Sequence, residues 1–339
     1  HGARYLVKSF AKDHRPVFAV ALEFLGQGEL TPMGVGEQWG AEGLSWLREV
    51  GGLSVPYAYR VYSSLFPSRE RSDHKAFSDD GIRSMLLMGR GESGVYWPYH
   101  TVEDDLERVD AEALSEAVDV VMSMLQRGPP VAGGGPAMSI PYVPFVLPGL
   151  VVWVLIGLGI GTGLLVGLPA WRTAIGGLGW ASVAGVVAGI VAVAPGFDRP
   201  MYGSMAELAQ WLWWMVCFWV LLATPFRKDG RQSAALVCAW MSAGLCAVHP
   251  ILALPWALMA VTCALSIRLW PMLFLVLPFP LFLTSGDLWR ELVFHGVLPG
   301  DPLWWLPMKC IAMWPVACVI LSVQPARSRF FHVAAGLLL

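Results

Sequence analysis

The sequence predicts an α/β domain in residues 1–126 and an all-α bundle of transmembrane helices in residues 143–325. Of its 339 residues, 56% are hydrophobic and only 14% are charged. Residues 1–140 nevertheless hold 13 Lys and Arg against 19 Asp and Glu, a formal charge of −6, whereas residues 141–339 hold 10 against 6. This division indicates a soluble part followed by a membrane part. The composition excludes a disordered chain and a nucleic-acid binder that relies on a basic surface.

Helical and strand-like patterns alternate through residues 1–126, which favours an α/β sheet. Helical spacing predicts a helix over 3–14, and the near-continuous apolar run at 17–25 predicts a strand buried on both faces. A helix is predicted over 37–50 and a strand over 81–88. Residues 127–142 are rich in Pro and Gly and are predicted to form a linker. A last helix over 111–125 has its predicted apolar face at Leu114, Ala117, Val118, Val121 and Leu125.

The apolar part contains enough long segments for about seven transmembrane helices, followed by a tail or the start of a further helix at 326–339. Alternate loops place seven Lys and Arg on one side of the membrane, and this side is predicted to be cytoplasmic. Residues 1–140 are then expected on the non-cytoplasmic side. All six cysteines lie after residue 140, so the soluble part has no disulfide framework. The predicted spans are 143–169, 174–196, 207–225, 233–249, 251–267, 269–285 and 303–323.

Three features of the soluble part point to metal chemistry. Glu23 lies inside the apolar run at 17–25, near the end of the predicted strand, where open α/β sheets place their ligands. A carboxylate in such a place is costly unless it is paired or binds a metal. The other two features are the Asp73-His74 pair and the segment that carries His100 and Asp104. Together they suit a metal site in an α/β enzyme.

The order LEFxGxG, SDHxxFxxxGI and YHTxxD resembles the di-zinc aminopeptidases of metallopeptidase family 28, over about residues 1–126. The apolar part resembles the membrane-anchored multipass branch of that family, which includes endoplasmic reticulum metallopeptidases. The resemblance implies a zinc-exopeptidase-like α/β domain that binds two zinc ions and acts on peptides with a free N-terminus. It implies that Glu23 and His100 are zinc ligands. It further implies substrate-binding or site-wall positions at Asp73, His74, Phe77 and Tyr99, and a ligand-orienting or capping role for Asp104.

The sequence departs from the family pattern in one respect. In the family, a His-x-Asp motif and a Glu-Glu pair supply the remaining zinc ligands and the general base. Neither motif occurs within residues 1–140 at a position that fits the family's order of motifs. We therefore expect them upstream of His1, so that this chain is the C-terminal portion of a membrane-bound peptidase and is inactive alone. The alternatives are a catalytically inactive peptidase-like assembly module, a glutaminyl-cyclase-like transferase and a transporter with a soluble accessory domain.

Overall fold

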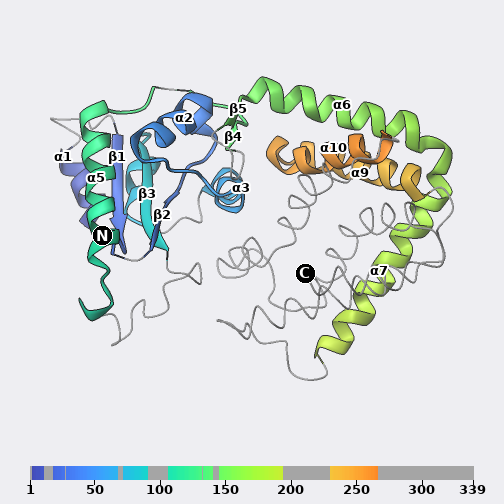
Figure 1. Cartoon of the computed structure of the whole chain (residues 1–339), viewed down its shortest axis with the longest axis horizontal. Helices are drawn as coiled ribbons and strands as arrows, with labels where there is room; N and C mark the ends of the chain where they lie inside the picture. Colours follow the sequence, from blue (N-terminus) through green and yellow to red (C-terminus); the bar gives the residue numbers. More distant parts are fainter. Residues whose placement is uncertain are drawn as a thin grey trace. The chain divides into compact units, whose positions relative to one another are not determined.

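The computed structural model describes residues 2–10, 18–26, 28–67, 72–90, 106–131, 133–139, 145–193 and 230–265. The chain forms two compact units, residues 1–152 and 153–339 (Figure 1). The described part of the first unit mixes strands and helices, which confirms an α/β region at the N-terminal end. The described part of the second unit is helical.

A three-stranded sheet forms the centre of the first unit. Its strands are β1 (Phe18–Glu23), β2 (Glu29–Met33) and β3 (Arg83–Arg90), and β3 lies between the other two. β1 pairs with β3 in parallel, with Glu23 opposite Met88. β2 pairs with β3 in the antiparallel direction. The carboxyl ends of the two parallel strands therefore meet at one edge of the sheet.

Among the residues that the structure describes, five α-helices lie around this sheet. They are α1 (Gly2–Phe10), α2 (Gly40–Gly51), α3 (Tyr57–Leu65), α4 (His74–Asp79) and α5 (Ala111–Arg127), and the 3-10 turn η1 (Glu37–Trp39) precedes α2. Asp110 caps the N-terminus of α5, and its carboxylate accepts a hydrogen bond from the Glu112 N–H at 2.9 Å. The helices predicted over 37–50 and 111–125 are thus confirmed.

The main apolar core lies between α2 and the sheet. Trp39 and Leu47 are fully buried there together with Met85 and Leu87 of β3. The Phe18 ring of β1 meets the Trp39 ring edge-on, with centroids 5.7 Å apart. Edge-to-face packing of this kind is the preferred geometry for aromatic pairs. The core fixes β1 and β3 against α2, and with them the sheet edge at which Glu23 lies.

Two expectations about burial are wrong. β1 is not buried on both faces, because Leu22 is 45% exposed and the other side chains of the strand are half-buried. Among the described residues, β1 has a neighbouring strand on the β3 side alone. α5 is also rotated relative to its predicted apolar face: Ala117 is buried, but Leu114, Val118 and Leu125 are exposed. Its buried residues are Ala113, Ala117 and Met124.

Part of the segment predicted as a linker packs against the first unit. The buried guanidinium of Arg60 in α3 donates to the Val35 carbonyl at 2.9 Å and to the Ala137 carbonyl at 3.0 Å. It also donates to the carbonyls of Gly36 and Gly135. Strand β4 (Met138–Ser139) then pairs with β5 (Val146–Leu147). Arg60 therefore holds Gly135 and Ala137 of this segment against the loop that follows β2.

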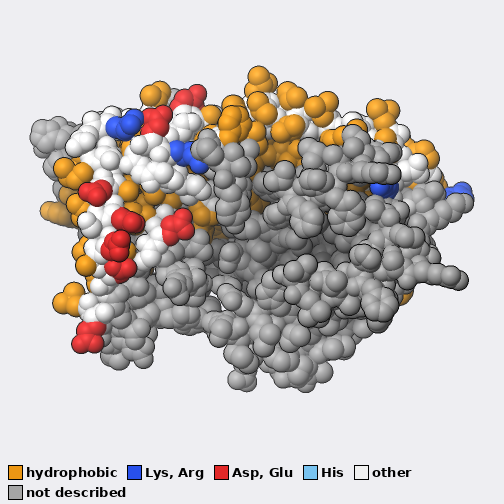
Figure 2. All heavy atoms as spheres, in the orientation of Figure 1, with side chains coloured by type: hydrophobic (Ala, Val, Ile, Leu, Met, Phe, Trp, Pro, Cys, Tyr) orange, Lys and Arg blue, Asp and Glu red, His pale blue; other side chains and the backbone are white. Residues whose placement is uncertain are grey.

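The described helices of the remaining part are α6 (Gly149–Gly167), α7 (Trp171–Val193), α9 (Gly230–Cys246) and α10 (Pro250–Ala264), and the 3-10 turn η4 (Leu168–Ala170) joins α6 to α7. Among the described residues, one helical stretch is long and apolar enough to cross a membrane: Gly149–Val183, with 35 residues and a window of 18 residues whose mean hydropathy is 2.3. Figure 2 shows apolar side chains gathered over α6. The spans predicted at 207–225, 269–285 and 303–323 lie outside the described residues, so the multipass bundle stays a prediction.

Glycines on one face of α6 allow close helix packing. A Cβ on Gly159 would lie 2.4 Å from the Ala257 carbonyl oxygen of α10, and one on Gly163 would lie 2.7 Å from the Ala235 carbonyl oxygen of α9. No atom lies within 4 Å of the position that a Cβ on Gly161 would take. Gly159 and Gly163 thus differ in role from Gly161, because the neighbouring helices α9 and α10 leave no room for a side chain at the first two positions.

Candidate metal centre

Glu23 is the last residue of β1, and its half-buried side chain lies at the carboxyl edge of the sheet. The Ser72 hydroxyl donates a hydrogen bond to Glu23 Oε1. Phe24, the next residue, has a left-handed backbone with φ of 52°. This conformation costs a non-glycine residue about 1–2 kcal/mol and is concentrated at functional sites. The chain thus turns sharply after Glu23, while Ser72 restricts the position of its carboxylate.

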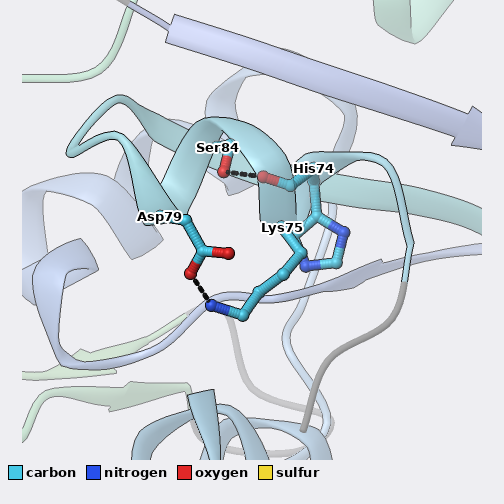
Figure 3. A network of polar contacts seen from close by, with 4 residues as sticks. All are labelled: His74, Lys75, Asp79 and Ser84. Atoms are coloured by element: carbon cyan, nitrogen blue, oxygen red, sulfur yellow. Dashed lines mark hydrogen bonds and ion pairs between the residues drawn. The ribbon is translucent and has the colours of Figure 1, made fainter. Parts of the chain in front are cut away.

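The Asp73-His74 pair lies next to Ser72, at the start of α4. Asp73 is exposed at the N-cap of the helix. His74 is buried, and its main-chain carbonyl accepts a hydrogen bond from the Ser84 hydroxyl of β3 at 2.7 Å. Figure 3 shows this contact beside the Lys75–Asp79 pair on the same helix. Ser84 therefore fastens the first turn of α4 to the sheet.

The His74 imidazole packs against the backbone at Gly34. A Cβ at Gly34 would lie 2.5 Å from His74 Nε2, and Gly34 has a positive φ of 70°. Both the conformation and the contact require glycine at this position. Phe77, a half-buried residue of α4, accepts the Ile82 N–H at 2.9 Å through its carbonyl and so closes the turn into β3. His74 and Phe77 are thus built into the packing around α4.

Tyr99, His100 and Asp104 lie outside the described residues, but both flanks of their segment are described. The segment leaves β3 after Arg90, two residues beyond the position that pairs with Glu23. On its return, the Asp110 N–H donates to the Gly26 carbonyl at 2.9 Å. A Cβ on Gly26 would lie 2.5 Å from Val109 Cγ1. The first flank therefore ends two residues beyond the partner of Glu23 on β3. The second flank contacts Gly26, in the turn that follows Glu23.

The described geometry fits one metal ligand. A carboxylate oxygen held in place by a neighbouring hydroxyl is a suitable zinc ligand, because the groups that hydrogen-bond to a ligand fix its orientation. Among the residues that the structure describes, no group of three or more His, Cys, Asp and Glu could hold a metal ion. A zinc site usually takes three or four protein ligands, so a zinc site at Glu23 would need partners from outside the described residues.

No role for Ser72, Phe24 or Gly34 follows from the sequence patterns. Ser72 directly precedes the Asp73-His74 pair, and this adjacency was the available signal. The backbone of Phe24 and the contact of Gly34 with His74 depend on tertiary packing and leave no pattern in the sequence.

This geometry defines an α/β domain with a polar site at the carboxyl ends of its parallel strands, the usual location of ligands in open α/β sheets. Residues 1–125 match peptidase family M28, so this part of the chain is an M28 domain. The family is one of metallopeptidases that typically bind zinc. None of the curated proteins compared with the chain matches it.

Proposed function

We propose that the complete protein is a membrane-anchored zinc aminopeptidase and that this chain carries two of its zinc ligands, Glu23 and His100. The observation that carries the proposal is the hydrogen bond from Ser72 to Glu23 within an M28 domain. It joins two of the three motifs of the sequence at the carboxyl edge of the sheet. The described flanks of the third motif lie near the same edge, and this supports His100 as the second ligand.

Each of the named residues has a proposed task. Ser72 restricts the carboxylate of Glu23, so that one oxygen keeps a fixed direction. Asp73 is exposed next to it and is suited to attract the free amine of a peptide. His74, Phe77 and Tyr99 form the wall of the site, and Asp104 orients the segment of His100. Bound zinc would supply a Lewis acid that polarises the scissile carbonyl.

The helical stretch Gly149–Val183 supports the membrane anchor, because its length and composition suffice for a span. We extend this to a multipass bundle on the strength of the apolar segments after residue 193. The domain is proposed to lie on the non-cytoplasmic side. A cysteine placed in residues 1–126 should therefore react with an impermeant thiol reagent from outside sealed cells or inside lumenal vesicles, and reaction from the cytoplasmic side alone would refute this orientation.

The main test uses the complete gene product expressed in membranes. Zinc content and the release of N-terminal amino acids from peptides are measured for the parent, Glu23→Ala and His100→Ala, with exposed Glu29→Ala as the matched control. Both ligand variants should lose zinc, and activity should fall by at least about a hundredfold, while the control keeps both. Full zinc and activity in both ligand variants would refute the ligand assignment.

The same preparation separates the alternatives. Folded protein without peptidase activity in the parent indicates an assembly module. Cyclisation of N-terminal glutamine without peptide hydrolysis indicates a transferase. Either result would overturn the proposed aminopeptidase while leaving the M28 domain in place.

A further inference from the structure

The helical stretch Gly149–Val183 is too long for one straight crossing of a membrane. Its 35 residues would extend for about 52 Å as a single α-helix, whereas the hydrocarbon core of a bilayer is about 30 Å thick. Pro169 lies in the turn η4, and Figure 1 shows the chain bending there between α6 and α7. α6 alone has 19 residues and a length of about 28 Å, which matches the core.

The position of α6 in the chain then gives the level of η4. α6 begins one residue after strand β5 of the first unit, so on the proposed membrane anchor its first turn lies at one surface of the bilayer. The length of α6 brings η4 to the opposite surface. The inference that follows rests on this proposed anchor.

The charge of Arg172 indicates the same level independently of helix length. Arg172 is the second residue of α7, and it is the sole charged residue of the sequence from position 128 to position 197. Its side chain is exposed. A charged side chain is costly inside the hydrocarbon core, so Arg172 belongs at the membrane surface. Helix length and charge therefore agree on the position of the turn.

Trp171 restrains the guanidinium of Arg172. Arg172 Cζ lies over the Trp171 ring, 5.3 Å from its centroid, which is a cation–π contact. The Trp171 side chain is itself 48% exposed. Trp favours the headgroup level of a membrane, because its ring is apolar and its N–H is polar. The pair thus presents a positioned cation at the level of the lipid phosphates.

A second basic residue lies at the same end of α6. A Cβ on Gly167, the last residue of α6, would lie 2.6 Å from the Gln232 carbonyl oxygen in the first turn of α9. η4 also contacts α9. Arg231 directly precedes Gln232 in the same turn of α9. Arg172 and Arg231 therefore add two positive charges to the end of the helical unit at which η4 lies.

We propose that the turn between α6 and α7 binds the phosphate group of an anionic glycerophospholipid, with Arg172 as its main ligand. A guanidinium offers a fork of N–H donors that matches two phosphate oxygens. Leu165 and Ile175, on the two sides of the turn, are exposed and apolar and would contact acyl chains. A phospholipid satisfies both features, because it joins a phosphate to acyl chains, whereas a free phosphate ion satisfies only the guanidinium.

An acidic side chain of the protein itself is the competing partner for Arg172. The sequence contains no Asp or Glu from position 120 to position 197. Asp229, two residues before Arg231, lies outside the described residues. If such a carboxylate neutralised Arg172, removal of the guanidinium would leave the lipid contacts of the turn unchanged.

Photo-crosslinking to lipid tests the proposal. The 339-residue chain is reconstituted into phosphatidylglycerol vesicles that contain a small fraction of phosphatidylglycerol with a photoreactive diazirine on its headgroup. After irradiation, mass spectrometry of chymotryptic peptides measures the yield of lipid adduct on residues 165–175. The variants are Arg172→Gln, the charge-conserving Arg172→Lys, and Arg127→Gln, which removes the same charge from an exposed residue of the first unit. Resistance to alkaline extraction shows that each variant is inserted in the bilayer.

Arg172→Gln should lower the yield of this adduct at least about fivefold, whereas Arg172→Lys should retain most of it and Arg127→Gln should leave it unchanged. Equal yields in the parent and in Arg172→Gln would overturn the proposal. Loss of the parent's adduct in inorganic phosphate, but not in chloride of equal ionic strength, would also overturn it, in favour of a free anion. Extraction of the parent by alkali would instead refute the proposed membrane anchor, so the two failures are distinguishable.

Discussion

Substitution of Gly34 by Ala tests the packing that holds the Asp73-His74 segment in place. Gly34 has a φ of 70°, and a Cβ there would lie 2.5 Å from His74 Nε2 and 2.7 Å from His74 Cδ2. The imidazole has little freedom to move away, because His74 is buried and the Ser84 hydroxyl holds its carbonyl at 2.7 Å. Ala at this position therefore introduces both a strained backbone and a steric clash.

The expected loss of unfolding free energy has two parts. The left-handed backbone costs about 1–2 kcal/mol for a residue with a Cβ. Displacement of a buried, rigid side chain costs about 1–3 kcal/mol. Gly34→Ala should thus destabilise the first unit by about 2–5 kcal/mol, which is a large share of the stability of an ordinary domain.

Gly52→Ala is the matched control, since Gly52 has a φ of 65° and no atom lies within 4 Å of the position that a Cβ would take there. It should show the backbone cost alone. Urea-dependent pulse proteolysis in detergent, read from fragments of residues 1–139, measures the unfolding free energy of both variants. The difference between them isolates the contact with His74, and it should disappear in the His74→Ala background. Equal losses for Gly34→Ala and Gly52→Ala would refute the reasoning.

Three further predictions follow from single contacts. Ser72→Ala in the complete gene product should weaken zinc binding about 10–100-fold, measured by competition with a chelator, because Glu23 loses its orienting hydrogen bond; unchanged affinity would contradict this role. Arg60→Met should destabilise the first unit by about 2–4 kcal/mol, because buried carbonyls lose their donor. Burial lowers the pKa of Arg60 from its ordinary value to about 10, and the Glu37 carboxylate opposes the shift. The loss should therefore stay constant between about pH 6 and 9, and the parent should gain stability only above about pH 10; a loss that varies between pH 6 and 9 would contradict this. Gly163→Leu should lower the thermal stability of the helical unit in detergent, whereas Gly161→Leu should not, because only the first meets neighbouring helices; equal effects would contradict the packing.

The periodic patterns of the sequence located α1, β1, α2, β3 and α5, but they did not indicate β2, α3 or α4. The helices α2 and α5 follow from apolar spacing, and the Asp110 cap marks the start of α5. The spacing of apolar residues indicated which side of α5 is apolar. It did not indicate which residues of that side are buried against the core. That choice depends on α2, which meets α5 from a distant part of the chain.

The candidate site divides in the same way. Glu23 stands out in the sequence because a carboxylate interrupts an apolar run, and the Asp73-His74 pair stands out by its resemblance to a family motif. Their proximity does not follow from the sequence, because 49 positions separate Glu23 from Ser72. The pairing of β1 with β3 and the packing of α4 on both strands bring them together.

By itself, the sequence determined the α/β character of the first part, the apolar character of the second and the residue types that suit a metal site. These properties depend on composition and on short-range periodicity, which a linear chain carries directly. Only the tertiary structure decided that Ser72 holds Glu23, that Gly34 supports His74, that Arg60 binds the segment after α5, and that β1 keeps an open edge among the described strands. Each of these depends on contacts between residues that are far apart in the chain, and such contacts exist only once the sheet and its helices have packed.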